Sequence, residues 1–169
     1  SVIILNYNYS KFISKCVKSC LNQNGKLNYE IIIIDDGSTD NSKSIINRFK
    51  DNKIKKFFLK RSGIENSSNF GFKKSKGKYI IRVDSDDYLH KDFLINTYKK
   101  IREKKNISFV YTDYFLVDKK KRKIEIKKLP NFDVKEIFQR GDFLATGTLY
   151  RKSTLTKNIT LCTPARPAL

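Results

Sequence analysis

The chain has 169 residues, the size of one domain, and its 39% hydrophobic and 12% aromatic content excludes an intrinsically disordered protein. It carries 36 Lys and Arg residues against 17 Asp and Glu, and the formal net charge of +19 could attract nucleic acid, an anionic membrane or a phosphorylated substrate. Because the lysines are spread along the chain, a solvated surface is the favoured interpretation. No apolar run approaches a membrane span, and the three cysteines lack metal-ligand spacing, so we expect a cytoplasmic protein.

Strand-like and helix-like segments alternate over the first two thirds of the chain. Residues 10–21 place apolar side chains at helical spacing, with Ser10 as the expected N-cap, whereas residues 30–34 are apolar on both faces, as in a strand inside a parallel sheet. Strands are predicted over 2–5, 30–34, 56–59 and 79–83, and helices over 10–21, 41–49, 67–75 and 91–104. This order is typical of βαβ units and predicts an α/β fold with a mostly parallel sheet flanked by helices.

The pattern changes after residue 104. Residues 109–117, a basic turn and residues 123–129 predict an antiparallel hairpin toward the C-terminus. We expect one domain over 1–155, followed by an irregular tail over 156–169 that has neither helical nor strand periodicity. The sequence begins without methionine, directly in a strand-like segment, and we therefore expect it to be a piece of a longer chain.

Two acidic clusters follow predicted strands. "DDGSTD" at 35–40 comes directly after the second strand, and "DSDD" at 84–87 comes directly after the fourth. Ligands of open α/β sheets bind beyond the carboxyl ends of the strands, so the two clusters could share one site. Carboxylate oxygens suit Mg²⁺ or Mn²⁺, and such a cation can bridge a substrate diphosphate. The alternative is that these residues only form turns and cap helices, but two clusters in matching positions favour a functional site.

Three segments, "SVIILNYNYSKFISKCVKSCLNQ", "YEIIIIDDGSTDNS" and "NFGFKKSKGKYIIRVDSDDYL", resemble the family 2 glycosyltransferases of the GT-A fold. The resemblance covers residues 1–94, which would be the nucleotide-sugar and metal-binding half, and extends weakly over 95–155, a partial acceptor half. It implies transfer of a sugar from a nucleotide-diphosphate sugar, with UDP-sugars favoured, to a glycan or lipid-linked acceptor in surface polysaccharide synthesis. Inversion at the anomeric carbon and assistance by a divalent metal, Mn²⁺ or Mg²⁺, are implied as well.

The resemblance also implies roles for individual residues. The nucleotide base would lie against Tyr7 and donate a hydrogen bond to Asp36 or its neighbour Asp35, while Asn8 shapes the turn. Asn69 and Gly71 match an "N-x-G" element near the donor phosphates. In the "DxD" element, Asp84 would lie near the ribose and the metal, and Asp86 would be a direct metal ligand. The implied nucleotide-sugar-binding set is Tyr7, Asn8, Asp35, Asp36, Asn69, Gly71, Asp84 and Ser85, and the implied metal ligands are Asp86 and Asp84.

Two departures from the family pattern concern charge and catalysis. Ser68 stands where many relatives carry an arginine, so that Lys73 or Lys74 would have to supply a cation for the diphosphate. An inverting transferase also needs a general base to deprotonate the acceptor hydroxyl. Nothing downstream of the "DxD" element matches the family's usual acidic element, and Asp142 is the one candidate, with a turn residue as the favoured interpretation.

Three hypotheses therefore stay open. The first is a glycosyltransferase domain, and the second is a donor-binding fragment that lacks part of its catalytic machinery. The third is a basic nucleic-acid-binding module, whose affinity would fall steeply with salt. It leaves both acidic clusters unexplained, so nucleic acid is not the expected partner. Peripheral contact with the cytoplasmic face of a membrane through the basic surface is a further open alternative.

Overall fold

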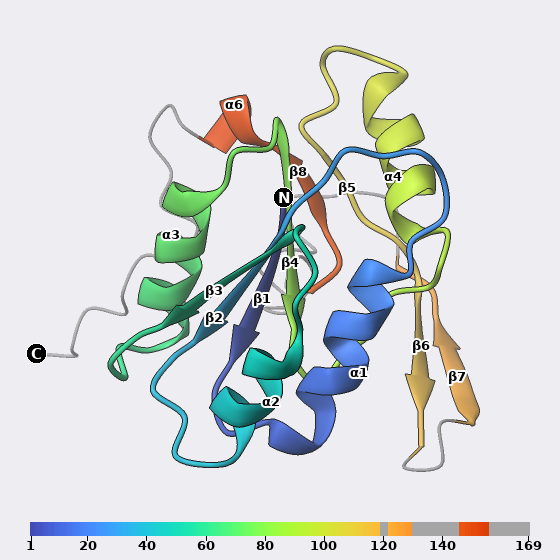
Figure 1. The fold of residues 1–169 in the computed structure, drawn as a ribbon. Helices are drawn as coiled ribbons and strands as arrows, with labels where there is room; N and C mark the ends of the chain where they lie inside the picture. The colour runs from blue at the N-terminus through green and yellow to red at the C-terminus, as the bar shows by residue number, and fades with distance from the viewer. Residues whose placement is uncertain (119–121, 130–145, 156–169) are drawn as a thin grey trace, which may run out of the picture.

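A six-stranded sheet forms the centre of the molecule in a computed structural model, which describes residues 1–118, 122–129 and 146–155 (Figure 1). The strand order is β3-β2-β1-β4-β8-β5, with parallel pairing from β3 through β4 and antiparallel pairing of β8 with both β4 and β5. The strands are β1 (Val2–Asn6), β2 (Ile31–Asp35), β3 (Ile54–Phe58), β4 (Tyr79–Asp84), β5 (Phe109–Val110) and β8 (Leu149–Arg151). The predicted mostly parallel α/β sheet is confirmed.

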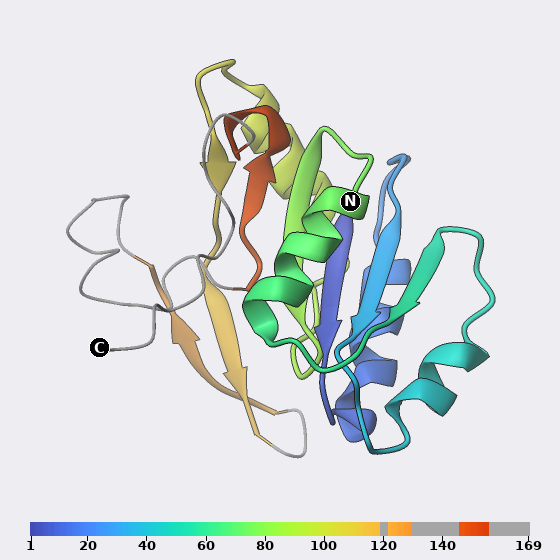
Figure 2. The same cartoon turned by 90° about the vertical axis from the view of Figure 1, so that its left-hand side faces the viewer.

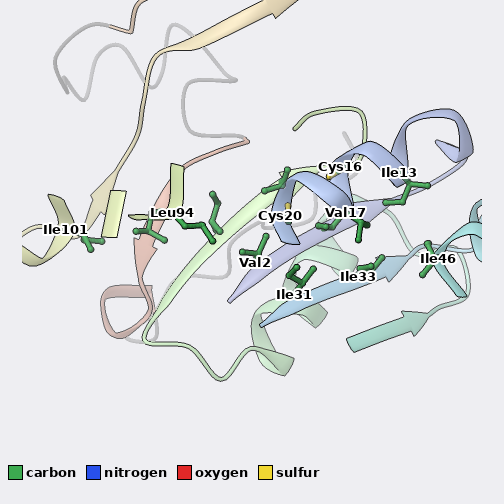
Figure 3. Packing of buried hydrophobic residues seen from close by; sticks show 14 residues of the cluster. Val2, Ile13, Cys16, Val17, Cys20, Ile31, Ile33, Ile46, Leu94 and Ile101 are labelled. Atoms are coloured by element: carbon green, nitrogen blue, oxygen red, sulfur yellow. The ribbon is translucent and has the colours of Figure 1, made fainter. Parts of the chain in front are cut away.

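Helices cover both faces of this sheet (Figure 2). The helices are α1 (Ser10–Leu21), α2 (Ser42–Arg48), α3 (Ile64–Lys74), α4 (Phe93–Arg102) and the short α6 (Lys152–Leu155). Buried residues of α1, α2 and α4 pack with one face of the strands, and Figure 3 shows Cys16 and Val17 of α1 above Ile31 and Ile33 of β2. On the opposite face, α3 packs Phe70 and Phe72 against the second apolar cluster. Two buried faces explain why β2 is apolar from Ile31 to Ile34.

The antiparallel hairpin is present as a separate two-stranded sheet of β6 (Tyr114–Val117) and β7 (Lys123–Lys127). The prediction of one continuous segment over 109–117 is wrong, because β5 joins the main sheet and residues 111–113 carry the chain to β6. The third strand of the prediction is displaced, since β3 runs from Ile54 to Phe58, and α3 begins three residues earlier than predicted, directly after Gly63. In the part of the chain that the structure describes, no helix is long and apolar enough to cross a membrane.

Ser10 is not the N-cap of α1. It is the first helical residue, the cap position belongs to Tyr9, and the side chain of Tyr9 makes no capping hydrogen bond. The backbone N–H of Ser10 instead donates to Oδ2 of Asp40, 2.9 Å away, so a carboxylate from the loop after β2 satisfies one of the free donors at the helix start. This contact ties the beginning of α1 to the loop that follows β2.

Candidate functional site

The carboxyl ends of β1, β2 and β4 lie side by side because the strands pair in parallel register. Leu5 pairs with Asp84 and Asn6 pairs with Asp35, so the residues after these strands face the same rim of the sheet. A cleft of about 290 Å³ opens there. It is lined by Leu5, Asn6, Tyr7, Tyr9, Asp36, Arg61, Ile64, Ser67, Asp84, Ser85 and Asp86. The two acidic clusters of the sequence therefore contribute to one cleft, as predicted.

Asp36 is buried in the cleft wall and holds the loop that follows β3. Its Oδ1 accepts hydrogen bonds from the N–H and the hydroxyl of Ser62, both at 2.9 Å. Its Oδ2 accepts from the N–H of Gly63 at 3.0 Å and from the guanidinium of Arg61. Burial alone would raise the pKa of Asp36, but these donors from Ser62 and Gly63, with the Ser67 hydroxyl nearby, outweigh burial and lower it. Asp36 is therefore a carboxylate at neutral pH.

Arg61 also covers the ring of Tyr7. The guanidinium carbon lies 3.7 Å from the ring centroid, within the range of a cation–π interaction. The Tyr7 side chain joins the end of β1 to the loop after β3 through this contact. The guanidinium of Arg61 and the aromatic ring of Tyr7 therefore meet at the end of the cleft where the sequence resemblance implies that the base binds.

Asp35 does not line the cleft and is used inside the turn. Its Oδ1 accepts from the N–H of Ser38 at 3.0 Å, and its Oδ2 accepts from the Ser38 hydroxyl at 2.6 Å and from the Asn6 amide at 2.8 Å. Asn8 has a positive φ of 58°, and its Oδ1 accepts from the N–H of Thr39 at 2.8 Å. Asn8 and Asp35 therefore shape the walls of the site, whereas Asp36 faces into it.

The carboxylates of Asp84 and Asp86 line the opposite side of the cleft. Oδ1 of Asp84 is buried without a hydrogen bond and lies 3.3 Å from Nε of Arg82, too poorly aligned to bond. Burial raises the pKa of Asp84, the charge of Arg82 opposes this rise, and the Asp86 carboxylate adds to it. The pKa of Asp87 is raised by burial and by Asp86. Clustered negative charge with a buried free oxygen is an environment that a cation would stabilise.

The carboxylate oxygens of the cleft suit a hard divalent cation, but they do not complete its coordination. Asp84 and Asp86 supply carboxylate oxygens, the ligand type that Mg²⁺ and Mn²⁺ prefer. Within the described ranges, no group of three or more His, Cys, Asp or Glu side chains is arranged to hold a metal. A cation bound here would complete its coordination with water or with oxygens of a bound substrate.

Four of the implied site residues lie outside the cleft lining: Asn8, Asp35, Asn69 and Gly71. Gly71 has a packing role, because a Cβ at this position would lie 2.6 Å from Cγ2 of Ile3 and 2.7 Å from Cδ1 of Ile34. The hydroxyl of Ser68 donates to the carbonyl of Ile64 within its own helix at 2.6 Å. Asp142 lies outside the described residues.

Sequence reasoning missed Arg61 and the residues of α3 that line the cleft, Ile64 and Ser67. The lysines considered as a cation source, Lys73 and Lys74, do not line it, and the Lys74 ammonium lies 5.4 Å from the ring centroid of Phe70. Arg61 follows the carboxyl end of β3, the strand next to β2 in the sheet. Ligands of open α/β sheets bind beyond the carboxyl ends of the strands, and this rule applies to the loop after β3 as it does to the acidic clusters.

Comparisons with known proteins agree with this geometry. The sequence profile described as "Glycosyl transferase family 2" matches residues 1–159. An uncharacterized glycosyltransferase of Rickettsia conorii is 41% identical over 126 residues, which cover 74% of this chain and 20% of that protein. Glycosyltransferase GlyG of Streptococcus pneumoniae is 36% identical over 121 residues, 70% of this chain and 40% of that protein.

Solved structures show the same fold. Staphylococcus aureus TarS in complex with UDP-GlcNAc superposes with a TM-score of 0.74 and 25% identity, covering 93% of this chain and 46% of that one. Pyrobaculum calidifontis mannosyltransferase PcManGT in complex with GDP-Man and Mn²⁺ has a TM-score of 0.66 at 17% identity, covering 91% and 44%, which shows the fold alone. The chain therefore spans less than half the length of these relatives. Together the profile, the relatives and the GT-A fold establish that this chain belongs to glycosyl transferase family 2.

Proposed function

We propose that this chain forms the donor-binding part of an inverting glycosyltransferase that uses a UDP-sugar. The observation that carries the proposal is the single cleft in which Tyr7, Asp36, Asp84 and Asp86 meet, although they come from three different strand ends. An aromatic ring and a buried carboxylate at one side suit a nucleotide base, and the acidic pair at the other suits a metal-bound diphosphate. The uridine preference is supported by the TarS relative, whose structure contains UDP-GlcNAc.

The implied site residues take different roles in this proposal. The ring of Tyr7 lies against the base, and the carboxylate of Asp36 accepts a base N–H. The buried Ser85, between Asp84 and Asp86 in the sequence, lines the cleft and contributes to donor binding. Asn8 and Asp35 support the site from the turns, and Gly71 brings α3 close to the sheet. Asn69 is assigned to the donor side on the sequence resemblance.

Asp84 and Asp86 would hold Mn²⁺ or Mg²⁺. When bound, such a cation stabilises the negative charge that develops on the nucleoside diphosphate as the glycosyl–phosphate bond breaks. The chain's own contribution is to keep both carboxylates at one rim of the sheet, where β4 ends against β1. Burial and mutual repulsion, which raise the pKa of Asp84, are relieved by a positive charge at this place.

The chain also contributes to the acceptor side in this proposal. We assign residues 1–94 to donor and metal binding and 95–155 to part of the acceptor half, with a glycan or lipid-linked acceptor of surface polysaccharide synthesis at the cytoplasmic face of a membrane. No described residue is assigned as the general base, and Asp142 stays the candidate that the sequence offers.

The first test is calorimetric titration of UDP into the protein with and without Mn²⁺. We expect binding that requires the metal and is lost in Asp86→Ala, because this substitution removes a ligand oxygen while leaving the sheet intact. Asp92→Ala changes an acidic residue at the N-cap position of α4, outside the cleft lining; this variant is the matched control and should bind as wild type. Metal-independent binding, or equal binding by Asp86→Ala, would contradict the assignment of the metal site.

A second candidate is a donor-binding unit that does not turn over by itself. It is favoured by the lengths of the relatives, since this chain covers 40% of GlyG and 46% of the TarS chain. Release of UDP from UDP-GlcNAc in the presence of acceptor distinguishes the two. Metal-dependent UDP binding without any release supports the second candidate, and release that depends on Asp86 supports the first.

A further inference from the structure

Arg61 lies where the two groups assigned to the base meet. Its guanidinium covers the Tyr7 ring at 3.7 Å and donates from Nη1 to Oδ2 of Asp36. The Asp36 side chain is 5% exposed, whereas that of Arg61 is 52% exposed. Arg61 is thus anchored to a buried carboxylate on one side while much of its side chain remains accessible to a ligand.

The guanidinium retains unused donors. A guanidinium has N–H groups on all three nitrogens and no acceptor. Within the described part of the chain, the carboxylate of Asp36 is the one hydrogen-bond acceptor of Arg61, and it uses Nη1. The remaining N–H groups belong to a side chain that lines the cleft. A ligand with a carbonyl oxygen beside Asp36 could therefore accept a charge-assisted hydrogen bond from Arg61.

We propose that Arg61 is a specificity residue for the base, and this inference rests on the proposed UDP-sugar donor. Arg61 and Asp36 form a donor–acceptor pair, because the guanidinium and the carboxylate are in direct contact. The imide edge of uracil presents the complementary pair, a ring carbonyl beside a ring N–H. Arg61 donates to the carbonyl oxygen, Asp36 accepts from the N–H, and the ring lies against the Tyr7 side chain.

Asp36 can accept the base N–H only if it releases a present donor. Its two oxygens already accept from Arg61, Gly63 and, twice, from Ser62. A carboxylate has about four acceptor sites, so these bonds fill it. The Ser62 hydroxyl can rotate away at little cost, because the backbone N–H of the same residue keeps its bond to Oδ1. The Arg61 contact can therefore persist when the base binds.

The charge of the cleft supports this role. Among the described residues that line it, Arg61 is the only one with a cationic side chain, whereas Asp36, Asp84 and Asp86 line it with carboxylates. An anionic nucleotide would otherwise enter a cleft of uncompensated negative charge at its base end. Arg61 offsets that charge there, whereas a divalent cation would do so at the Asp84 and Asp86 end.

The test compares UDP with 2-thio-UDP and 4-thio-UDP, in each of which sulfur, a weaker acceptor, replaces one ring carbonyl oxygen. Calorimetric titrations in Mn²⁺ would use wild type, Arg61→Ala, Arg61→Lys and, as a matched control, Arg48→Ala, which removes an exposed arginine at the end of α2. We expect Arg61→Ala to weaken UDP binding about 10-fold or more and Arg48→Ala to leave it unchanged.

The analogues separate hydrogen bonding from a structural role. One thio analogue should bind wild type several-fold more weakly than UDP does, and this difference should disappear in Arg61→Ala. Any effect of sulfur size would persist in that variant. Arg61→Lys keeps the positive charge but lacks the planar guanidinium, so it should also bind UDP and the thio analogue with similar affinity. This variant replaces Arg61→Ala in the test if Arg61→Ala fails to fold.

The inference is overturned if Arg61→Ala binds UDP as tightly as wild type or more tightly, or if the thio penalties are the same in wild type and both Arg61 variants. Failure of wild type to bind UDP at all is a different result. It would refute the proposed UDP-sugar donor, and the inference about Arg61 would fall with it.

Discussion

Gly71 is the residue at which α3 approaches the sheet most closely. Alanine usually stabilises a helix interior by up to about 1 kcal/mol relative to glycine. Here the added Cβ would lie 2.6 Å from Ile3 and 2.7 Å from Ile34, whose side chains are 1% and 0% exposed and belong to central strands. Because neither neighbour can move outward, overpacking of about 1–3 kcal/mol should outweigh the gain in helix propensity.

We therefore expect Gly71→Ala to lower the free energy of unfolding, by up to about 2 kcal/mol after a gain in propensity of about 1 kcal/mol is subtracted. Urea unfolding followed by circular dichroism measures this change. Lys73→Ala, at an exposed position of the same helix, is the control and should stay within about 0.5 kcal/mol of wild type. A stabilised Gly71→Ala protein would show that α3 can move away from β1 and β2.

The positions of site residues in the cleft were predictable where a single strand carries the residues there, and not where two loops combine. The position of Asp84 and Asp86 follows from their place directly after an apolar strand. Which of Asp35 and Asp36 lines the cleft does not follow from the sequence. The answer depends on the hydrogen bonds from Ser38 to Asp35 and from Ser62 to Asp36. Arg61 was missed for the same reason, since its partners Tyr7 and Asp36 are distant in sequence.

Elements with strong periodicity were predicted best. The apolar runs of β1, β2 and β4 and the amphipathic face of α1 gave bounds within two residues of those observed. Strand β8 was not predicted, because its three residues show no periodicity and its antiparallel pairing with β4 and β5 depends on tertiary contacts. Strand β8 also explains why the predicted segment 109–117 is not one strand, because β5 pairs with β8 and so belongs to the main sheet.

Within the part of the chain that the structure describes, the β6–β7 hairpin is separate from the main sheet. Its strands pair with each other and form a sheet of their own. Its exposed large hydrophobic residues are Tyr114, Phe115, Leu116, Ile124 and Ile126, of which Ile124 is 67% exposed. An isolated two-stranded hairpin is marginally stable in water, so its hydrogen bonds should open more often than those of the main sheet.

We expect backbone amides of β6 and β7 to exchange with deuterium much faster than those of β1 and β2, by at least about a hundredfold, because the central strands open only with global unfolding. Hydrogen exchange followed by mass spectrometry or NMR provides the measurement. Strand β3, at the edge of the main sheet, is the internal control for edge effects. Equal protection of the hairpin and β1 would mean that other parts of the chain cover it.

At the scale of the whole molecule, the net positive charge and the acidic cleft are separate properties. Lysine ammonium groups lie over aromatic rings in several regions, for example Lys15 on Tyr88, Lys53 on Tyr29 and Lys123 on Phe115. These cations are distributed over several elements and do not follow one groove, which favours the interpretation of a solvated basic surface. The cleft, in contrast, gathers carboxylates that would repel a nucleic acid backbone.

A formal net charge of +19 on 169 residues should destabilise the compact state through self-repulsion. Salt screens this repulsion, since the Debye length falls from about 20 Å at 20 mM to about 7 Å at 200 mM ionic strength. Single surface ion pairs, such as that between Lys100 and Glu103, contribute at most about 1 kcal/mol, so their weakening by salt should not cancel the gain.

We therefore expect the thermal midpoint to rise by several degrees between 20 and 200 mM NaCl, as measured by circular dichroism. KCl should have the same effect at equal ionic strength, because screening depends on charge and not on ion identity. A midpoint that falls with salt would mean that attractive ion pairs outweigh the net repulsion and that the excess of lysines is locally compensated.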